Sequence, residues 1–141
     1  MCFALLEENT LFSGDHIMGW STTVISPPDG DMELYLENLE AVRARGFDVI
    51  RPTHGPAIEA TETYLSALIE HRFDREREIL AALDKGIQAV DNIVAAVYIG
   101  LASELFPAAA CTVLAHLIWL VDKGLVGADP EPRLKARFWR Q

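Results

Sequence analysis

Short apolar segments alternate with one amphipathic helical segment in the N-terminal part of the chain, and this order constrains the fold more than any other feature. Residues 2–6 and 10–13 are typical of two strands joined by a tight turn. Asp31 can cap a helix that runs to about Arg45, and residues 47–50 form a further apolar strand. A hairpin, a helix and a strand in this order predict an α/β layer.

The opening strand indicates a sheet that extends beyond it. Residues 2–6 are apolar without alternation, which is typical of a strand covered on both faces. We therefore expect a preceding segment that the 141 residues do not include. Another short strand is expected at residues 22–25, and Gly46 is expected to end the helix that begins after Asp31.

A long helix is expected from about Glu59 to Leu83. Its apolar residues recur at helical spacing, and Thr61 is expected to cap its start. The middle of this helix, residues 71–78, is densely charged. We expect these side chains to be solvated or paired along the helix.

The C-terminal part of the chain has the element order of a winged helix. Asp91 can cap a short helix, Pro107 can open a second one through Lys123, and residues 124–127 and 136–139 are typical of a small hairpin. The helix that ends at Lys123 then occupies the recognition-helix position. The expected parts are a partial α/β layer at 1–58, a connecting helix at 59–85 and a winged-helix-like subdomain at 86–141.

The charge of the chain limits its partners. The net charge of −9 argues against a nucleic-acid binder that works by bulk attraction to phosphate. Near the C-terminus, however, basic residues occur without acidic ones: Arg133, Lys135, Arg137 and Arg140. A local anion-binding patch and a solvated strand both account for this segment, and the solvated strand is the more common case.

The sequence predicts no association with a membrane. The longest apolar segment, residues 105–121, contains Pro107 and His116 and is expected to be too short and too polar to span a bilayer. No basic segment precedes an apolar one at the N-terminus, so no signal peptide is expected. Cys2 and Cys111 are too few for a disulfide framework, and a cytoplasmic location is expected.

Two loops carry residues that could bind a metal. Gly14-Asp15-His16 and Pro52-Thr53-His54-Gly55-Pro56 each follow a predicted strand. Strand ends are where open α/β layers usually present ligand groups, and a carboxylate with an imidazole suits zinc. Two ligands do not make a stable site, however, so the spacing alone predicts metal binding only weakly.

The same loops carry a resemblance to a known family. The segment LFSGDHIMGWSTTVISP, followed by VIRPTHGPAI, resembles the second half of the metallo-β-lactamase superfamily. The segments YLSALIEHRFDREREILAAL and AHLIWLVDKGLV resemble the branch that has a C-terminal winged-helix tail and includes a mitochondrial endoribonuclease. The resemblance covers essentially the whole chain. It implies the C-terminal part of an αββα sandwich followed by a winged-helix-like subdomain.

The resemblance implies roles for particular residues. Asp15 matches the carboxylate that bridges two divalent metal ions, zinc first among the candidates, and His54 matches the last histidine ligand. His16 would support the ligands rather than bind metal. Ser21, Thr22 and Thr23 lie in a loop on the substrate side.

The sequence departs from the family in one large respect. The signature His-x-His-x-Asp-His, which supplies most of the ligands, does not occur in the chain. His71 and His116 lie on predicted helices and are expected to pack or to pair along the helix. We therefore expect weak metal binding or none, and no hydrolysis by this polypeptide alone.

Three functions remain open at this point. In the first, the chain is part of a metal-dependent hydrolase that cleaves a small ester, a thioester or a phosphodiester such as single-stranded RNA. In the second, the winged helix is a nucleic-acid-binding or oligomerisation module without catalysis. In the third, the chain is a structural protein that self-associates through its exposed half-sheet.

Overall fold

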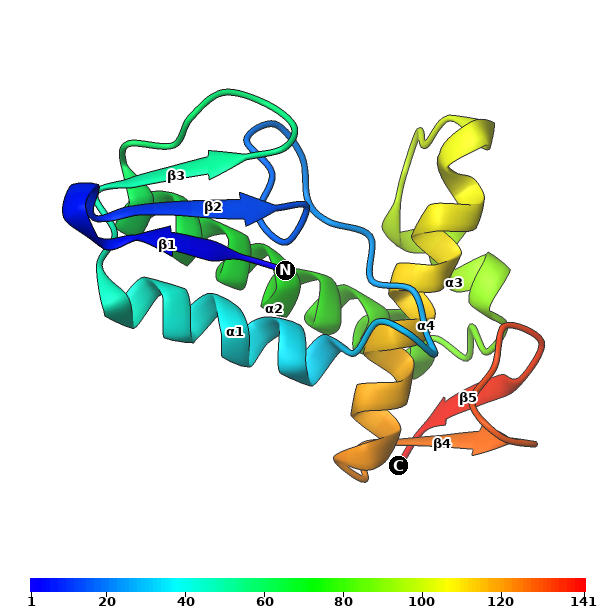
Figure 1. Ribbon diagram of the computed structural model, residues 1–141. Coiled ribbons are helices and arrows are strands. Elements are labelled where there is room, and N and C mark those ends of the chain that lie inside the picture. Colours follow the sequence, from blue (N-terminus) through cyan, green and yellow to red (C-terminus); the bar gives the residue numbers. More distant parts are fainter. The chain divides into compact units, whose positions relative to one another are not determined.

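The computed structural model describes residues 1–141, and the chain divides into two compact units. The first, here called the N-terminal unit, comprises residues 1–23 and 36–71. The second, the C-terminal unit, comprises residues 24–35 and 72–141. The helices α1 (Met32–Arg45) and α2 (Thr61–Asp84) contribute residues to both units. The elements are labelled in Figure 1.

The N-terminal unit contains a three-stranded sheet in the order β1-β2-β3. Strand β1 (Phe3–Leu5) pairs antiparallel with β2 (Thr10–Gly14), and β2 pairs parallel with β3 (Val49–Pro52). A 3₁₀ turn at Leu6–Glu8 and a left-handed Asn9 join β1 to β2. The predicted α/β class is therefore confirmed. The crossover that makes β2 and β3 parallel contains α1.

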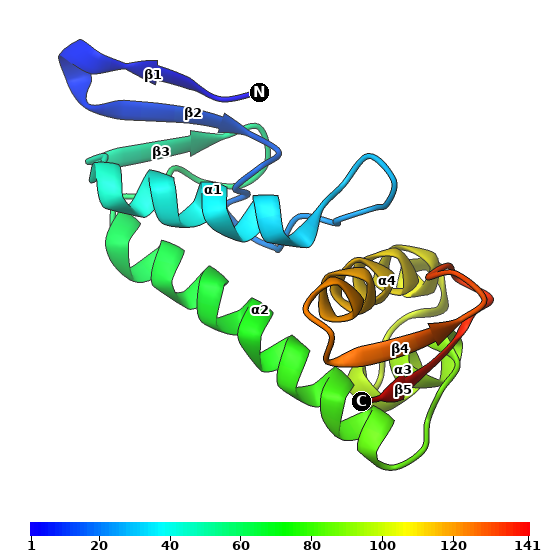
Figure 2. The same cartoon turned by 90° about the horizontal axis from the view of Figure 1, so that it is seen from below.

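One face of the sheet is covered by helices and the other is open. In Figures 1 and 2, α1 and the first half of α2 lie on one side of the sheet. Leu11 and Ile50 are buried on that side, whereas Phe3 is 63% exposed and Phe12 is 43% exposed on the other. The prediction that residues 2–6 are covered on both faces was wrong. Strand β1 forms an edge of the sheet, and its apolar composition reflects a face that no other part of the chain covers.

The ends of α1 follow from local sequence. The Asp31 carboxylate accepts a hydrogen bond from the backbone N–H of Leu34 at 2.9 Å, as an N-cap should. Gly46 follows the helix with φ +67°, a conformation that favours glycine, and so ends it as predicted. Residues 22–25 are irregular, so the short strand predicted there was wrong.

The C-terminal unit has the predicted winged-helix element order. After the second half of α2 come α3 (Val90–Val97), a 3₁₀ turn at Ser103–Leu105, α4 (Phe106–Asp122) and the antiparallel pair β4 (Val126–Asp129) and β5 (Arg137–Arg140). These elements share one apolar core, which includes Ile79, Ile93, Leu117, Leu120 and Phe138.

Thr61 is the first residue of α2, and its hydroxyl donates to the Phe47 carbonyl at 2.7 Å rather than capping the helix.

Helix α4 is the central helix of this core. Val113, Leu117 and Leu120 are fully buried, and buried side chains occur on nearly every side of the helix. By length and composition the segment Ser103–Asp122 is apolar enough to cross a membrane, contrary to the prediction. More than half of this segment is buried inside the structure, which is typical of a core helix.

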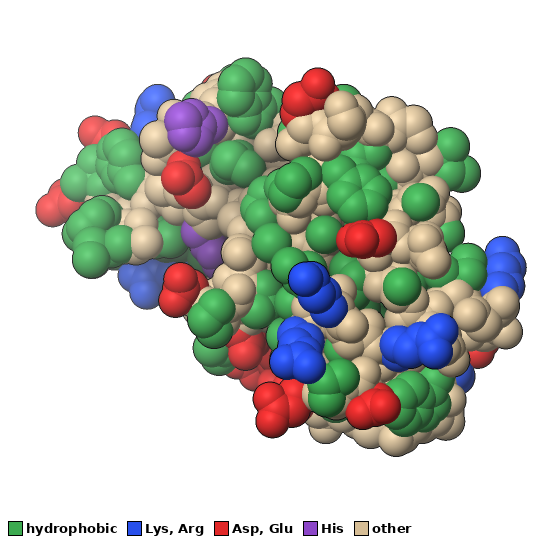
Figure 3. Space-filling view, turned by 90° about the vertical axis from the view of Figure 1, so that its right-hand side faces the viewer, with side chains coloured by type: hydrophobic (Ala, Val, Ile, Leu, Met, Phe, Trp, Pro, Cys, Tyr) green, Lys and Arg blue, Asp and Glu red, His purple; other side chains and the backbone are tan.

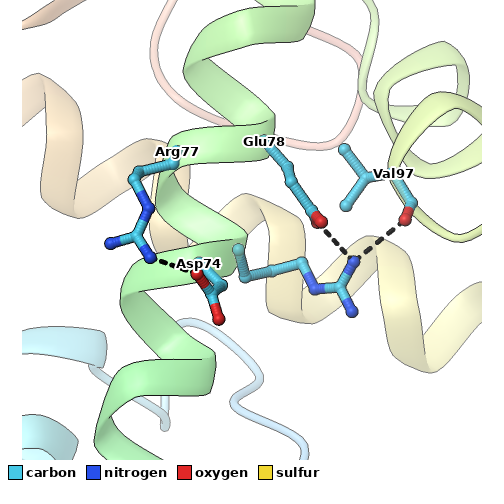
Figure 4. A network of polar contacts seen from close by, with 5 residues as sticks. Asp74, Arg77, Glu78 and Val97 are labelled. Carbon is cyan, nitrogen blue, oxygen red and sulfur yellow. Dashed lines mark hydrogen bonds and ion pairs between the residues drawn. The ribbon is translucent and has the colours of Figure 1, made fainter.

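Two arginines in the charged middle of α2 contact other elements, whereas Asp74, Arg77 and Glu78 are exposed. Arg72 is only 2% exposed, and its guanidinium lies 5.0 Å from the centre of the Tyr35 ring. Arg75 donates to the Val97 carbonyl at 2.9 Å and pairs with Glu78 at 2.6 Å (Figure 4). The prediction that these side chains are solvated or paired along the helix is wrong for Arg72, whose buried guanidinium contacts Tyr35. Arg75 is paired along the helix as predicted and in addition contacts α3.

Candidate metal centre

Asp15 and His54 lie together although 38 other residues separate them in sequence. Asp15 follows the last residue of β2, and His54 follows β3 by one residue. Because β2 and β3 are parallel neighbours, their carboxyl ends meet at the same edge of the sheet. The His54 Nε2 atom is 3.6 Å from Asp15 Oδ1, and both side chains are more than half exposed.

Main-chain hydrogen bonds hold the two loops against each other. The N–H of Thr53 donates to the Gly14 carbonyl at 3.1 Å, and the N–H of Gly19 donates to the His54 carbonyl at 2.9 Å. The Tyr64 hydroxyl from α2 donates to the Met18 carbonyl at 2.5 Å. These bonds hold the loops that carry Asp15 and His54 in place.

The close approach of the loops requires glycine at two positions. A Cβ atom on Gly19 would lie 2.4 Å from the Pro56 carbonyl oxygen. Gly55 has φ +95°, and a Cβ there would lie 2.8 Å from the Gly19 backbone. Gly14 and Gly55 lie in the two loops that the sequence singles out, whereas Gly19 lies outside them. Only the fold shows that Gly19 faces Gly55.

Thr23 holds the loop that carries Asp15. Its hydroxyl forms a hydrogen bond with the Asp15 carbonyl and another, at 3.1 Å, with the His16 carbonyl. The predicted substrate-side position of Ser21, Thr22 and Thr23 stays a prediction. Ser21 is exposed, and Thr22 is half-buried.

His16 lies behind the donor pair in a more protected setting. Its backbone N–H donates to the Ser13 carbonyl at 3.2 Å, and its side chain is half-buried. Burial lowers the pKa of the His16 imidazole below its ordinary value, and the nearby N-terminal ammonium lowers it further. The neutral imidazole is therefore favoured at this position.

The donor pair has the spacing of metal ligands but does not form a complete site. Two ligands on one tetrahedral zinc, each about 2.0–2.1 Å from the ion, lie roughly 3.3 Å apart. The observed 3.6 Å is close to that separation and is too long for a hydrogen bond. However, no group of three or more His, Cys, Asp or Glu residues could hold a metal ion. The residues present do not fit a dinuclear centre by themselves.

The remaining histidines lie elsewhere. His116 is fully buried on α4, with its ring centre 6.5 Å from that of Trp119. His71 is half-buried on α2. Cys2 and Cys111 are both free thiols.

The comparisons with known proteins cover the whole chain. Residues 89–133 match the family model of the beta-lactamase associated winged helix domain. The lactamase-like protein nscB of Trichophyton verrucosum is 31% identical over 99% of this chain and 52% of its own length. The lactamase-like protein adaB of Aspergillus niger is 28% identical over 98% of this chain and 47% of its own length.

Solved structures show the same fold. A metallo-beta-lactamase family protein from Thermus thermophilus superposes with a TM-score of 0.83 at 22% identity, over 99% of this chain and 44% of that protein. The chain therefore has the fold of metallo-β-lactamase family proteins. A beta-lactamase domain protein from Burkholderia ambifaria superposes with a TM-score of 0.82 at 23% identity. The chain spans about half the length of the curated relatives that it matches.

The similarity to lactamase-like proteins extends over both halves of the chain. The resemblance recognised from the sequence is confirmed, and the winged-helix match falls within the predicted segment 86–141. A hollow of about 450 Å³ in the C-terminal unit, lined by residues such as Pro27, Leu114 and Trp119, does not include the donor pair.

Proposed function

We propose that this chain supplies Asp15 and His54 to the dinuclear metal centre of a metal-dependent hydrolase, and that the other ligands lie outside these 141 residues. The observation that carries the proposal is the 3.6 Å separation of the two donor atoms, which come from adjacent parallel strands. Asp15 and His54 would hold the metal ions, Asp15 in the bridging role and His54 at the second metal, as the resemblance implies.

The proposed substrates are a small ester, a thioester or a phosphodiester, including single-stranded RNA. A metal pair in such a centre supplies a hydroxide at neutral pH and polarises the scissile bond. In this chain the main-chain hydrogen bonds of Thr53 and Gly19 orient the loops of Asp15 and His54, and a hydrogen bond from Thr23 holds the Asp15 loop. With two donors the chain does not position a hydroxide, so we infer that it does not hydrolyse a substrate alone.

A metal titration of the chain tests this proposal. In calorimetry with zinc we expect at most one ion per chain, bound weakly, because a stable site needs three or four ligands. His54→Ala is expected to abolish the binding, and His71→Ala, which changes a histidine on α2, is expected to leave it unchanged. Tight binding of two ions per chain would contradict the ligand set proposed here.

The coding region upstream of Met1 provides an independent test. An in-frame His-x-His-x-Asp-His motif there, in a longer polypeptide that hydrolyses a chromogenic ester or thioester, is the expected result. If that longer polypeptide has the motif and Asp15→Asn leaves its activity unchanged, the proposed role of Asp15 is wrong.

We also propose that the isolated chain self-associates through the open face of its sheet. Phe3 and Phe12 are cross-strand partners on that face, and β1 has an unpaired edge. Exposed aromatic side chains beside an open strand edge favour pairing with another chain.

Sedimentation velocity over a range of protein concentrations tests the self-association. We expect dimers or larger species that become monomers in Phe12→Lys. Trp20→Lys changes another exposed aromatic residue of the same unit, 73% exposed and outside the sheet, and is expected to leave association unchanged. A monomer at all concentrations would refute the proposal. We further infer a cytoplasmic location, for which the two free thiols are the support.

A further inference from the structure

The β4–β5 hairpin has two faces of different character. Phe138 is fully buried and Val126 is 1% exposed, so these residues face the apolar core of the unit. Side chains alternate along a strand, so Arg137 and Trp139 lie on the opposite face. The hairpin is visible in Figure 2.

Trp139 lies flat over a glycine on this outer face. Gly127 is its partner across the hairpin, and a Cβ on Gly127 would lie 2.3–2.5 Å from three atoms of the indole. The indole therefore rests on the Gly127 backbone. Trp139 is nevertheless 39% exposed, which leaves the other side of the ring accessible. An indole supported on one side and open on the other is a platform on which a planar ring can stack.

Exposed basic residues occur on β5 and in the segment that precedes it. Arg133, Lys135 and Arg137 are all exposed. The ion pairs of the unit engage Arg75, Arg77, Lys123 and Arg140 instead. Asp129 is opposite Arg137 in the strand register, but the two form no ion pair. On the face shown in Figure 3, basic and acidic side chains both lie among hydrophobic ones.

A polar hollow adjoins Arg137. It has a volume of about 390 Å³, and its lining includes Gln88, Asn92 and Arg137. A guanidinium and two side-chain amides are donors for phosphate oxygens. Trp139, which forms the platform, and Arg137, which lines the hollow, are two residues apart on β5.

We propose that this outer face of the hairpin binds single-stranded nucleic acid, with a base stacked on Trp139 and phosphate groups contacting Arg137 and its basic neighbours. The combination of an aromatic platform with flanking cations is what sequence-independent binding of single strands requires. The mode differs from groove recognition by a winged helix, because α4, in the recognition position, is buried in the core. The proposal does not depend on the metal centre.

Fluorescence anisotropy of labelled oligouridylate and oligodeoxythymidylate, with the full chain, tests this proposal. We expect binding that weakens roughly 10- to 20-fold between about 50 and 200 mM salt, as release of counterions from about three phosphates predicts. Trp139→Leu, which keeps an apolar cover on Gly127, is expected to weaken binding about 5- to 100-fold, the loss caused by removing one stacked base. Trp139→Phe is expected to retain most of the affinity.

Two matched controls separate this site from general charge and aromatic effects. Trp20→Leu and Arg77→Gln change an exposed tryptophan and an exposed arginine away from the hairpin, and binding is expected to persist in both. Arg137→Gln is expected to weaken binding and to reduce the salt dependence. The proposal would be overturned if neither oligonucleotide bound the chain, or if Trp139→Leu bound as tightly as the wild-type chain. It would also be overturned if inorganic phosphate displaced the labelled oligonucleotide as effectively as unlabelled oligonucleotide does. A preference for the ribose or the deoxyribose strand would identify the natural ligand.

Discussion

Replacement of Gly55 by alanine is expected to separate the two donor residues and destabilise the N-terminal unit by about 2–4 kcal/mol. Two costs combine in this estimate. The left-handed backbone at φ +95° disfavours a side chain, and the new Cβ would lie 2.8 Å from the Gly19 backbone. The measurement is hydrogen exchange at the amides of Thr53 and Gly19, which donate the bonds that join the loops. Their protection should fall by about 100-fold, which corresponds to about 2.7 kcal/mol.

Gly46→Ala is the matched control for this variant. Gly46 belongs to the same unit and also has a left-handed backbone, with φ +67°, but no atom lies within 4 Å of the position that a Cβ would take there. Only the backbone cost of about 1–2 kcal/mol then applies. Equal destabilisation by the two variants would mean that the Gly19–Gly55 approach contributes nothing to the site.

Arg75→Gln is expected to lower the free energy of unfolding by about 1.5–3 kcal/mol, the range for a hydrogen bond to a charged group in a protected setting. The Arg75 side chain is 16% exposed, donates to the Val97 carbonyl at the end of α3, and lies 4.3 Å from the centre of the Tyr98 ring. Glutamine is too short to keep these contacts. Urea denaturation followed by circular dichroism measures the effect.

Arg77→Gln provides the comparison on the same helix. The Arg77 side chain is 60% exposed and pairs with Asp74 (Figure 4), a surface ion pair of the kind that contributes about 0–1 kcal/mol. We expect the free energy of unfolding of this variant to lie within about 0.5 kcal/mol of that of the wild-type chain. A larger loss in Arg77→Gln than in Arg75→Gln would show that the contact with α3 is not what stabilises the unit.

The local parts of the fold could be predicted because their causes are local. Asp31 at the start of α1 and Gly46 at its end act within a few residues of themselves, and the structure has the helix between them. The donor pair could be proposed for a similar reason, since each loop follows an apolar strand in the sequence. That the two strands are parallel neighbours was implied by the intervening helix.

The predictions that were wrong share one physical cause, which is that the outcome depends on contacts between residues far apart in the sequence. Residues 2–6 are apolar in a way that suits a strand buried on both faces, but exposure depends on what else is present to cover it. Arg72 was expected to be solvated or paired along the helix, because nothing in the sequence shows that the Tyr35 ring lies beside its guanidinium. Gly19 carries no local signal at all, since its partner Gly55 lies in a separate loop.

The bonds that join the Asp15 and His54 loops come mostly from peptide groups rather than from side chains. Peptide groups are the same whatever residue carries them, so mutations at many loop positions change the surroundings of the donors without displacing them. Substitutions at exposed loop positions such as Ser21 are therefore expected to leave the separation of Asp15 and His54 unchanged, whereas a side chain at position 19 or 55 would change it.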